Sequence, residues 1–514
     1  MGLNLGDCLR LSAIANPQAP CLVYDTLRLS YGEVDLAARR VAGLLVSAGV
    51  KPGDRVALML PNLPQFPVIY FGILYAGATA VPLNPLIRPR ELAHVLADAE
   101  VHTLFAFEEM ADAAIAMHGS GALENLYLVE AGFAPKAHPV GRSFMEAFAG
   151  AEPQADMVQT RPEDLAVILY TAAQKGRPRG AMLSHFNLFN NALTISTRTL
   201  KYYPEDIFLC VLPLFHGFGQ TTMLNAPLLT GSSIVLSPRF DANHSLELIA
   251  KERITLVALV PTMLHFILNG ARDDAPKIDS LRCLVTGGAK LNLDTAAAFT
   301  QRFGVPVLEG YGLTETSPVV AFNQTAETNV PGSVGLPIWG CEVVVVDDKG
   351  SHLAVGVEGE VVVRGHNTFL GYLNDPEGTA ELLRNGWLHT GDRGYFDADG
   401  HLYLTGLKKD MILRAGMNVY PREVELAIES HPAVAQAAVV GVPDLVRGED
   451  VKAFVVLSGA EPITENELKA YCRDTLSSYK CPRRIEFVDE LPRDAEGGID
   501  KPVLRSRESL AAGR

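Results

Sequence analysis

The segment from Tyr311 to Pro318, YGLTETSP, brings an aromatic ring, hydroxyl groups and a carboxylate together directly after the apolar run VPVLEG. Tyr311 could stack on a flat base, and Thr314 could donate a hydrogen bond to a phosphate oxygen. Glu315 could hold Mg2+, a hard cation that takes oxygen ligands and bridges to phosphates. An ordinary turn after a strand, with a capping threonine, would account for the same residues. Spacing alone leaves both interpretations open.

Two further segments carry groups that suit a nucleotide. The run TGGAKL, from Thr286 to Leu291, ends another apparent strand, and its paired glycines would let the backbone approach a ligand closely. A tight turn explains those glycines equally well. In GWLHTGD, the carboxylate of Asp392 could accept hydrogen bonds from both hydroxyls of a ribose. An exposed aspartate in a turn is the commoner occurrence.

A cluster of basic residues follows the strand-like run DLAVILY. Lys175, Arg177 and Arg179 surround Gly176 and Gly180. Because backbone amides and cations together hold phosphates, this pattern indicates an anion-binding loop. A basic surface loop is the competing interpretation.

Two other runs are less specific. PLFHGFG contains His216, which is either a packed or capped histidine, the commoner case, or a catalytic one. ILRAGMNVYPREVE places Gly416 in a loop and Pro421 at a helix start. Glu423 and Glu425 then fall in the first helical turn, where the helix dipole favours acidic residues. For this last run the residues themselves support a structural role only.

The elements that must position these residues alternate between short apolar runs and helical patterns. The apolar runs are RVALML, DLAVILY, DIFLCVLPL, SSIVLS, TLVALV and RCLVTGG. Because they are apolar throughout rather than alternating, we expect buried strands in sheets covered by helices on both faces, an α/β fold. Prolines divide the uncharged stretch 56–87 into a strand and a helix, which favours a buried β–turn–α unit over a membrane span.

From about Val334 the pattern changes to CEVVVVDDKG, GEVVVRG and GHLYLTG, whose turn residues are typical of a small antiparallel sheet or barrel. After Gly406, a charged GLKKD segment precedes strand and helix patterns that could form a compact α+β domain. We therefore predict an N-terminal domain over residues 1–407, with its barrel part at about 331–406, and a C-terminal domain over residues 408–514.

Composition limits the classes of partner. A chain of 514 residues exceeds one ordinary core. Its net charge of -15 disfavours nucleic acid, since duplex binding relies on Lys and Arg to displace counterions, whereas a small anion needs only a local positive pocket. The seven cysteines form no CxxC pair, so we expect free thiols, no zinc site and a cytoplasmic location. The first residues lack the pattern of a signal peptide.

The order of the motifs is more specific than any one of them. They follow one another as YTxxxxGRPRGAMLSH, PLFHGFG, TGGAKL, EGYGLTETSP, GWLHTGD, GLKKDMILRAGMNVYPREVE and YKCPRRIEFVDELPR. From Leu29 to its C-terminus the chain resembles the adenylate-forming superfamily, which includes acyl- and aryl-CoA synthetases, luciferases and peptide-synthetase adenylation domains. It is most similar to single-chain CoA ligases, because no carrier or condensation module is present.

The resemblance implies a large N-terminal domain of layered sheets plus a small barrel, followed by a mobile C-terminal lid. It implies that a carboxylic acid is first joined to ATP with release of pyrophosphate. The lid then rotates so that CoA can attack the acyl-adenylate. Developing phosphate charge is held by Mg2+ and basic donors. The implied ligands are therefore ATP or AMP, Mg2+ and CoA, with a small carboxylic acid as substrate.

By position, the resemblance also implies roles for single residues. The acyl pocket would be walled by His216, Gly217, Val260 and the Gly287 region. The predicted catalytic residues are Glu315, also the magnesium ligand, Thr314 at the α-phosphate, His216 between acyl group and phosphate, and Lys409 at the lid hinge. The predicted nucleotide-binding residues are Gly288, Ala289 and Tyr311 at the adenine, Asp392 at the ribose, and Thr171, Lys175 and Gly416.

The phosphate loop departs from the family pattern. The family has Thr-Ser-Gly-Thr-Thr-Gly followed by x-Pro-Lys-Gly, whereas residues 171–180 read TAAQKGRPRG. Three hydroxyl-bearing positions, at 172, 174 and 175, and the glycine at 173 are lost, so the loop has fewer donors and less freedom for positive φ. Lys175 and Arg179 preserve charge but not that geometry.

Two further departures also fall on ATP chemistry. The Gly-Arg pair before the hinge is Gly406-Leu407, and the Gly-Lys pair that supplies the adenylation lysine is Gly497-Gly498. Loss of one preorganised cation at developing charge costs on the order of 10²–10³ in rate. Lys501 lies three residues later and would need a register shift to substitute.

We therefore predict an acyl-CoA synthetase-family protein whose ATP-dependent half-reaction is impaired. One alternative is acyl transfer or hydrolysis from a preactivated acyl group without ATP. Another is a non-catalytic protein that binds acyl-CoA or an adenylate. An engineered, adenylation-dead ligase would have the same sequence features. The sequence does not determine the acid.

Overall fold

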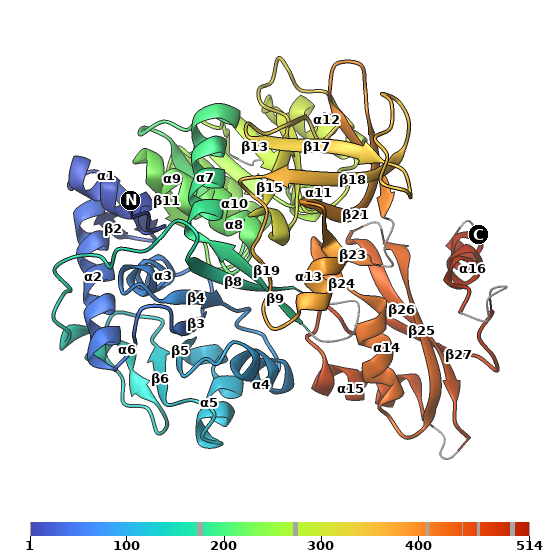
Figure 1. Cartoon of the computed structure of the whole chain (residues 1–514), viewed down its shortest axis with the longest axis horizontal. Helices are drawn as coiled ribbons and strands as arrows, with labels where there is room; N and C mark the ends of the chain where they lie inside the picture. The colour runs from blue at the N-terminus through green and yellow to red at the C-terminus, as the bar shows by residue number, and fades with distance from the viewer. Residues whose placement is uncertain are drawn as a thin grey trace.

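A computed structural model describes residues 2–171, 178–270, 276–407, 411–444, 446–459, 463–493 and 499–512. Figure 1 shows a larger N-terminal domain and a smaller C-terminal domain beside it. The α-helices are α1 Asp7–Ala15, α2 Tyr31–Ser47, α3 Gln65–Tyr75, α4 Pro89–Asp98, α5 Asp112–Gly119, α6 Phe144–Ala149, α7 His185–Thr194, α8 Gly217–Gln220, α9 Ala226–Thr230, α10 Ala242–Lys251, α11 Pro261–Gly270, α12 Leu293–Phe303, α13 Pro376–Leu382, α14 Pro421–Glu429, α15 Glu465–Thr475 and α16 Lys501–Ala512.

The first large sheet contains most of the strands that carry site motifs. Its order is β16 (Leu336–Pro337), β15 (Val319–Phe322), β14 (Val307–Gly312), β13 (Cys283–Thr286), β12 (Leu256–Leu259), β10 (Ile207–Cys210), β11 (Ser233–Leu236), β1 (Pro20–Tyr24) and β2 (Leu27–Ser30). From β14 to β1 each neighbouring pair is parallel. The predicted run DIFLCVLPL is a strand only over Ile207–Cys210, and Pro213 within it has no N–H for a ladder.

The second large sheet has the order β19 (Gly371–Tyr372), β9 (Arg179–Ser184), β8 (Leu165–Thr171), β4 (Thr79–Pro82), β3 (Arg55–Met59), β5 (Thr103–Phe107), β6 (Asn125–Val129) and β7 (Arg142–Ser143). β8 and β9 form an antiparallel hairpin with Thr171 opposite Arg179. That hairpin brackets the predicted phosphate loop, and residues 172–177 within it lie outside the described ranges.

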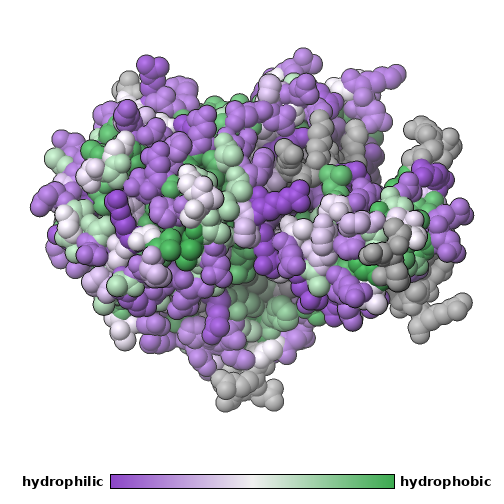
Figure 2. All heavy atoms as spheres, turned by 90° about the horizontal axis from the view of Figure 1, so that it is seen from below, coloured by the Kyte–Doolittle hydropathy of each residue, from purple (hydrophilic) through white to green (hydrophobic). Residues whose placement is uncertain are grey.

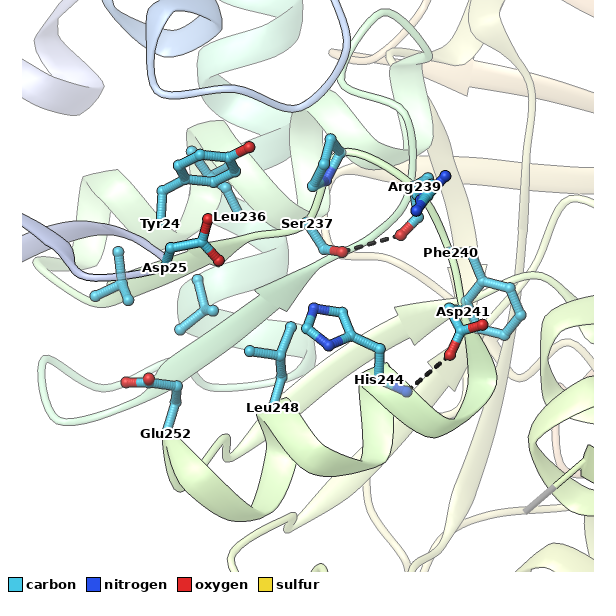
Figure 3. Close-up of a pocket in the computed structure, with 13 residues that line it drawn as sticks. Tyr24, Asp25, Leu236, Ser237, Arg239, Phe240, Asp241, His244, Leu248 and Glu252 are labelled. Atoms are coloured by element: carbon cyan, nitrogen blue, oxygen red, sulfur yellow. Dashed lines mark hydrogen bonds between the residues drawn. The ribbon is translucent and has the colours of Figure 1, made fainter. Parts of the chain in front are cut away.

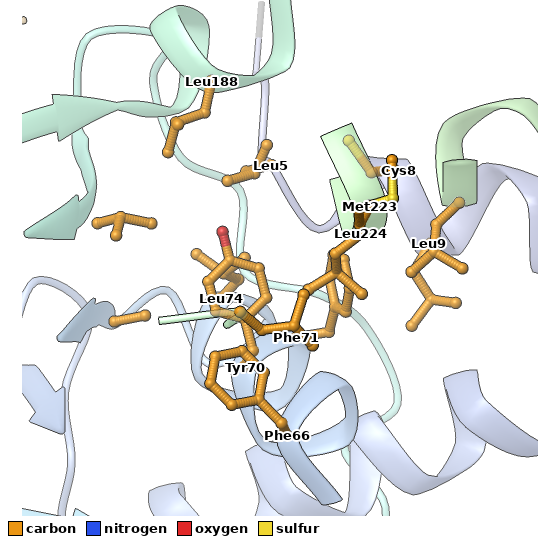
Figure 4. Close-up of a cluster of buried hydrophobic side chains, with 14 of the residues drawn as sticks. Leu5, Cys8, Leu9, Phe66, Tyr70, Phe71, Leu74, Leu188, Met223 and Leu224 are labelled. Carbon is orange, nitrogen blue, oxygen red and sulfur yellow. The ribbon is translucent and has the colours of Figure 1, made fainter. Parts of the chain in front are cut away.

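Helices cover both faces of each large sheet, as the apolar runs predicted. The main core lies between the two sheets and includes side chains of α1, α2, α3 and α7, several of which Figure 4 shows around Tyr70 and Phe71. A second cluster packs α10, α11 and α12 on the outer face of the first sheet. A third packs α4 and α5 on the outer face of the second sheet. The α/β layered fold expected from the sequence is confirmed.

A small antiparallel sheet follows, where the sequence predicted a sheet or barrel. It pairs β17 (Cys341–Val346), β18 (Gly359–Gly365), β21 (Trp387–Phe396) and β20 (Leu383–Arg384), and β22 (Leu402–Leu407) also pairs with β21. Its buried valines pack together with Tyr311 and Val320 of the first sheet. This packing brings Asp392, in β21, close to the strand that carries Tyr311.

The C-terminal domain, here called the lid, has its own sheet and core. The sheet has the order β24 (Met417–Val419), β23 (Ile412–Arg414), β26 (Gly448–Leu457) and β25 (Val434–Asp444), and β27 (Arg484–Phe487) pairs with β26. Its hydrophobic cluster runs from Ile412 to Ile485 without a residue of the larger domain, here called the body. The boundary between residues 407 and 408 stays a prediction, because 408–410 lie outside the described ranges.

Figure 2 shows hydrophilic residues over most of the face seen from below, with hydrophobic residues in smaller groups between them. In the part of the chain that the structure describes, every helix is too short or too polar to cross a membrane.

Candidate functional site

The predicted site residues gather at the carboxyl ends of parallel strands in the first sheet. β10 lies between β11 and β12, so the strand order proceeds in opposite directions on its two sides. Ligands of open α/β sheets bind in the crevice where the order reverses in this way. The chain carries His216 after β10, Val260 after β12, Gly288 and Ala289 after β13, and Tyr311 within β14.

Tyr311 and Asp392 form one buried pair. The Tyr311 hydroxyl donates a hydrogen bond to Oδ2 of Asp392 at 2.5 Å, and the two side chains are only 9% and 8% exposed. Burial, together with the Asp392 charge, holds the pKa of Tyr311 far above its usual value. Asp392 therefore lies within a buried strand, where the competing interpretation placed it in an exposed turn.

Glu315 forms a second pair with Tyr372, which sequence reasoning missed. The Tyr372 hydroxyl donates to Oε1 of Glu315 at 2.6 Å, and the backbone N–H of Phe369 donates to the Glu315 carbonyl at 3.0 Å. Thr314 and Glu315 lie in the 3-10 helix η4 (Thr314–Thr316). The signal for Tyr372 was the GYLND run, in which its ring follows a glycine with φ +129° at Gly371.

Strand β9 packs against η4 and joins this pair to the phosphate-loop hairpin. The guanidinium of Arg179 lies 5.1 Å from the centre of the Tyr372 ring, and its Nε is 3.0 Å from Oδ2 of Asp375. Arg179 occupies the place of the family's lysine in the x-Pro-Lys-Gly run. Its charge is therefore paired with Asp375 at the start of α13. Thr171 ends β8 directly opposite Arg179.

His216 begins α8, where its carbonyl accepts a hydrogen bond from the N–H of Gln220 at 2.9 Å. The side chain is exposed to solvent, yet burial by the surrounding protein lowers the pKa of His216. The two observations agree if solvent reaches the imidazole at one edge while protein surrounds the rest. A lowered pKa keeps this ring neutral at neutral pH.

Residues of the lid also lie at the candidate site. Gly416 joins β23 to β24 with φ +81°, and a Cβ built there would lie 2.9 Å from Cγ1 of Val260. Only glycine allows both this backbone conformation and this approach. Tyr420 follows in the lid; burial raises its pKa, and the charges of Glu315 and Asp392 raise it further. The lid therefore faces both carboxylates of the body.

Two of the predicted site residues, Lys175 and Lys409, lie outside the described residues, as does Gly498. The others come together from β8, the α8 start, the β13–α12 loop, β14, η4, β21 and the lid hairpin. Their individual roles stay predictions. Beside them, the structure adds Tyr372 and Tyr420, which no spacing argument had selected, and it pairs Arg179 of the predicted anion-binding loop with Asp375.

Glu315 has the chemistry of a magnesium ligand without a complete coordination set. Within the described ranges, no group of three or more His, Cys, Asp or Glu side chains is placed to hold a metal ion. The Tyr372 hydrogen bond engages Oε1 of Glu315 and orients the carboxylate. Mg2+ binds through one or two carboxylates with phosphate oxygens and water. Glu315 therefore suits Mg2+ when a substrate phosphate supplies further oxygens.

Two surface clefts lie along the first large sheet. Figure 3 shows one of about 620 Å³ beside the carboxyl ends of β1 and β11, with Asp25, Arg239 and His244 on its walls. Another, of about 630 Å³, lies between α12 and β14 and includes Glu309, whose pKa burial raises to about 7. Neither contains a predicted site residue. The contacts among the predicted site residues, rather than cleft volume, identify the candidate site.

Comparison with known proteins agrees with this geometry. The model of the AMP-binding enzyme family matches residues 9–373, and that of the AMP-binding enzyme C-terminal domain matches residues 423–497. The long-chain-fatty-acid–CoA ligase of Bacillus subtilis is 34% identical over 98% of this chain and 95% of that relative.

Two solved structures are informative. One is a double mutant of o-succinylbenzoate CoA synthetase from Bacillus subtilis, bound with its product analogue OSB-NCoA. It has a TM-score of 0.86 at 28% identity and covers 98% of both chains. The other is ATP-bound MatB from Rhodopseudomonas palustris, with a TM-score of 0.74 at 32% identity and 99% coverage of both. Fold, motif order and relatives together show that the chain belongs to the AMP-binding, adenylate-forming enzyme family and is an enzyme of its acid–thiol (CoA) ligase group.

Proposed function

We propose that this chain transfers an acyl group from an acyl-adenylate to CoA, and that its own formation of the adenylate from ATP is impaired. The coarser activity, that of an acyl-CoA ligase family, comes from the relatives. The finer division between the two half-reactions rests on residues of this chain. The proposal uses two features of the lid: it places Gly416 and Tyr420 at the site, and it has Gly498 where the family has the adenylation lysine.

The observation that carries the proposal is the position of Lys501. The lysine expected in the lid is Gly498 here, and Lys501 is the nearest replacement. Its Nζ lies 2.7 Å from Oε1 of Glu425, an almost fully buried carboxylate of α14. The same Oε1 accepts the N–H of Val439 at 3.0 Å. Because this ion pair lies wholly inside the lid, it moves with the lid and keeps Lys501 away from the body.

The lid orientation supports the transfer half of the reaction. Gly416 approaches Val260, and Tyr420 lies near the charges of Glu315 and Asp392. The o-succinylbenzoate CoA synthetase complex, which holds a product analogue, has the higher TM-score although ATP-bound MatB has the higher identity.

Acyl transfer to CoA does not require the lysine that is absent at position 498. The sulfur of CoA forms a bond to the acyl carbon, the bond from that carbon to the phosphate oxygen breaks, and AMP leaves with the bonding electrons. The thiol proton is released to solvent. Thr314 and the backbone near Gly288 would hold the leaving AMP, and Asp392 its ribose. Bound Mg2+ at Glu315 would neutralise phosphate charge. No cation at position 498 is required for these bonds.

The test separates the half-reactions. ATP–pyrophosphate exchange over a panel of carboxylic acids measures adenylation, and a preformed acyl-adenylate with CoA measures transfer. The expected result is slow exchange and measurable thioester formation. Brisk exchange by the unaltered chain would contradict the proposal. Hydrolysis of the adenylate without thioester, or binding with neither product, would instead favour the two alternative functions.

Gly498→Lys sharpens this test. Restoring one cation at developing charge should raise exchange on the order of 10²-fold, with transfer from the preformed adenylate unchanged. Gly498→Met is the matched control, because it adds similar length without charge. Equal rates for the two variants would show that the phosphate loop, rather than position 498, limits adenylation.

The acid is not assigned. The relatives act, by their names, on acids as different as long-chain fatty acids and o-succinylbenzoate. The same panel of acids, supplied as adenylates, would define the preference.

A further inference from the structure

A buried ion cluster joins the lid to the body away from the site. Lys480 of the lid lies 2.5 Å from Oε1 of Glu91, in α4 of the body, and 2.7 Å from Oε1 of Glu423, in α14 of the lid. Ser477 of the lid donates a hydrogen bond to Oε2 of Glu91 at 2.5 Å. Figure 1 shows α4 and α15 side by side, and Ser477 and Lys480 follow α15. We call these four residues the bridging cluster.

The cluster is shielded from water. Its side chains are 3% exposed at Lys480, 5% at Glu423 and Ser477, and 8% at Glu91. Two charges are taken out of water only where partners satisfy them closely. Leaving one of them unpaired is costly, so a lid that moved away would have to rehydrate or re-pair Glu91 and Lys480. The bridging cluster therefore favours the lid position seen here.

Glu91 suits a fixed anchor. It lies in the first turn of α4, where the helix dipole stabilises a negative charge. The backbone N–H of Arg88 also donates to Oε2 of Glu91 at 3.4 Å. The carboxylate is thus oriented by its own helix before the lid arrives. On the lid side, Glu423 keeps Lys480 charged and in place, and burial raises the pKa of Glu423 itself.

The same rigid lid carries Gly416. Glu423 lies in α14, which begins directly after the β23–β24 hairpin and Tyr420. Holding Lys480 and Glu423 against Glu91 therefore holds the hairpin against Val260. We infer that Glu91 is a positioning residue for acyl transfer, which acts through Lys480 and Ser477 to hold the lid in its transfer orientation. This inference rests on the proposed function.

Glu91→Gln tests it without unfolding the lid, because Lys480 keeps Glu423 as a partner. Single-turnover transfer from a preformed acyl-adenylate to CoA should slow by about tenfold or more. The dissociation constant of the adenylate should stay within about twofold, since all its predicted contacts except Gly416 are on the body. The matched control is Glu486→Gln, which removes a carboxylate 2.6 Å from another buried lysine, Lys452, entirely within the lid. The control should transfer at the unaltered rate.

Ser477→Ala is a second test variant, and it changes no charge. It should slow transfer by a few fold, and the double variant with Glu91→Gln should be no slower than Glu91→Gln alone, because both act through one carboxylate. Additive effects would place Ser477 outside the bridging cluster and count against the inference.

Hydrogen–deuterium exchange supplies a readout that does not depend on turnover. Glu91→Gln should speed exchange of the amides in residues 412–419, while those paired between β25 and β26 keep their protection. Unchanged exchange at 412–419, or loss of protection throughout the lid, would overturn the inference. If the unaltered chain transfers no acyl group, the proposed function fails, and the exchange measurement still decides whether Glu91 positions the lid.

Discussion

At the scale of single residues, the two carboxylates of the site are each held by a tyrosine hydroxyl. Tyr311 is bonded to Asp392 and Tyr372 to Glu315, and all four side chains are at most 9% exposed. A buried carboxylate without donors is costly, so each tyrosine both stabilises and orients its partner. Orientation is what a ligand for ribose or magnesium requires.

Tyr372→Phe removes one of these donors and keeps the ring. The unfolding free energy of the body should fall by about 1–3 kcal/mol, because the buried Glu315 loses a hydrogen bond to a charged group. Urea unfolding followed by fluorescence measures this change. Tyr395→Phe is the control, because its ring stacks on Tyr403 and that contact survives. A control change of the same size would contradict the role given to the Tyr372 hydroxyl.

The buried side chain of His185 makes the unfolding free energy depend on pH. Its Nδ1 accepts the N–H of Leu5 at 2.9 Å, and burial lowers the pKa of His185 to about 4. Between this value and the unfolded pKa near 6.5, the unfolded chain binds more protons. Stability is therefore complete above pH 6.5 and falls as the pH drops toward 4, by about 3 kcal/mol in all.

His185→Gln, which does not titrate, should lose less stability over the same interval. Chemical denaturation at pH 7, 5.5 and 4.5 would show the difference between the two proteins growing smaller as the pH falls. A difference independent of pH would mean that His185 remains neutral for another reason or titrates equally in both states.

At the scale of elements, the hairpin β23–β24 is the part of the lid that must come closest to the body. Gly416 at its turn combines positive φ with the approach to Val260. Gly416→Ala should slow acyl transfer by about tenfold or more, because the added methyl group meets Val260 and the lid cannot seat. Stopped-flow measurement with a preformed adenylate tests this.

Gly448 provides a matched comparison for Gly416. It has φ +78°, and a Cβ there would lie 3.8 Å from the nearest atom, a carbonyl of the lid itself. Gly448→Ala should cost about 1 kcal/mol of lid stability through backbone strain and leave transfer nearly unchanged. Adding Val260→Ala to Gly416→Ala should recover part of the rate. Equal slowing by both alanine variants would attribute the effect to strain alone.

Helix α14 carries two acidic residues whose ion pairs could not be predicted from the sequence. Pro421 begins it, as predicted. Glu423 and Glu425 were interpreted through the helix dipole, yet both are buried and bonded to lysines from other elements, Lys480 and Lys501. The dipole explains why acidic residues are tolerated there. The ion pairs explain why these two are needed.

At the scale of the whole molecule, the lid has a core of its own. Its hydrophobic cluster draws on β23, β24, α14, β25, β26, α15 and β27 and on Leu476 and Cys481 between α15 and β27, all within the lid. Residues 408–514 produced alone should therefore fold and unfold cooperatively, as measured by circular dichroism on heating. Residues 423–497 would lack Ile412, Val419 and Lys501 and should be markedly less stable. An unstructured 408–514 fragment would show that the body completes the lid and would move the predicted boundary.

The contacts between the lid and the body join residues that are far apart in sequence. Among the described residues, one group lies at the site, with Gly416 near Val260 and Tyr420 near Glu315 and Asp392, and another is the bridging cluster. Such contacts suit a lid that must leave and return, because few groups need to be separated. Of these contacts, only the bridging cluster lies away from the predicted substrate-binding residues.

The sequence by itself determined the layered α/β class, the order of the motifs and the three departures from the family pattern. A uniformly apolar run indicates a strand that is buried on both faces. The residues of a motif give the chemical groups that are present. Both are local properties of the chain. The change of Lys to Gly498 and of Arg to Leu407 could be stated without coordinates for the same reason.

Only the tertiary structure decided which side chains meet. Glu315 and Tyr372 are 57 residues apart, Tyr311 and Asp392 are 81 apart, and Lys480 and Glu91 are 389 apart. Periods of 2 and 3.6 residues identify the face on which a side chain lies, but not the element packed against it. That choice depends on the path of the chain through two large sheets and on the seating of the lid, which no local pattern contains.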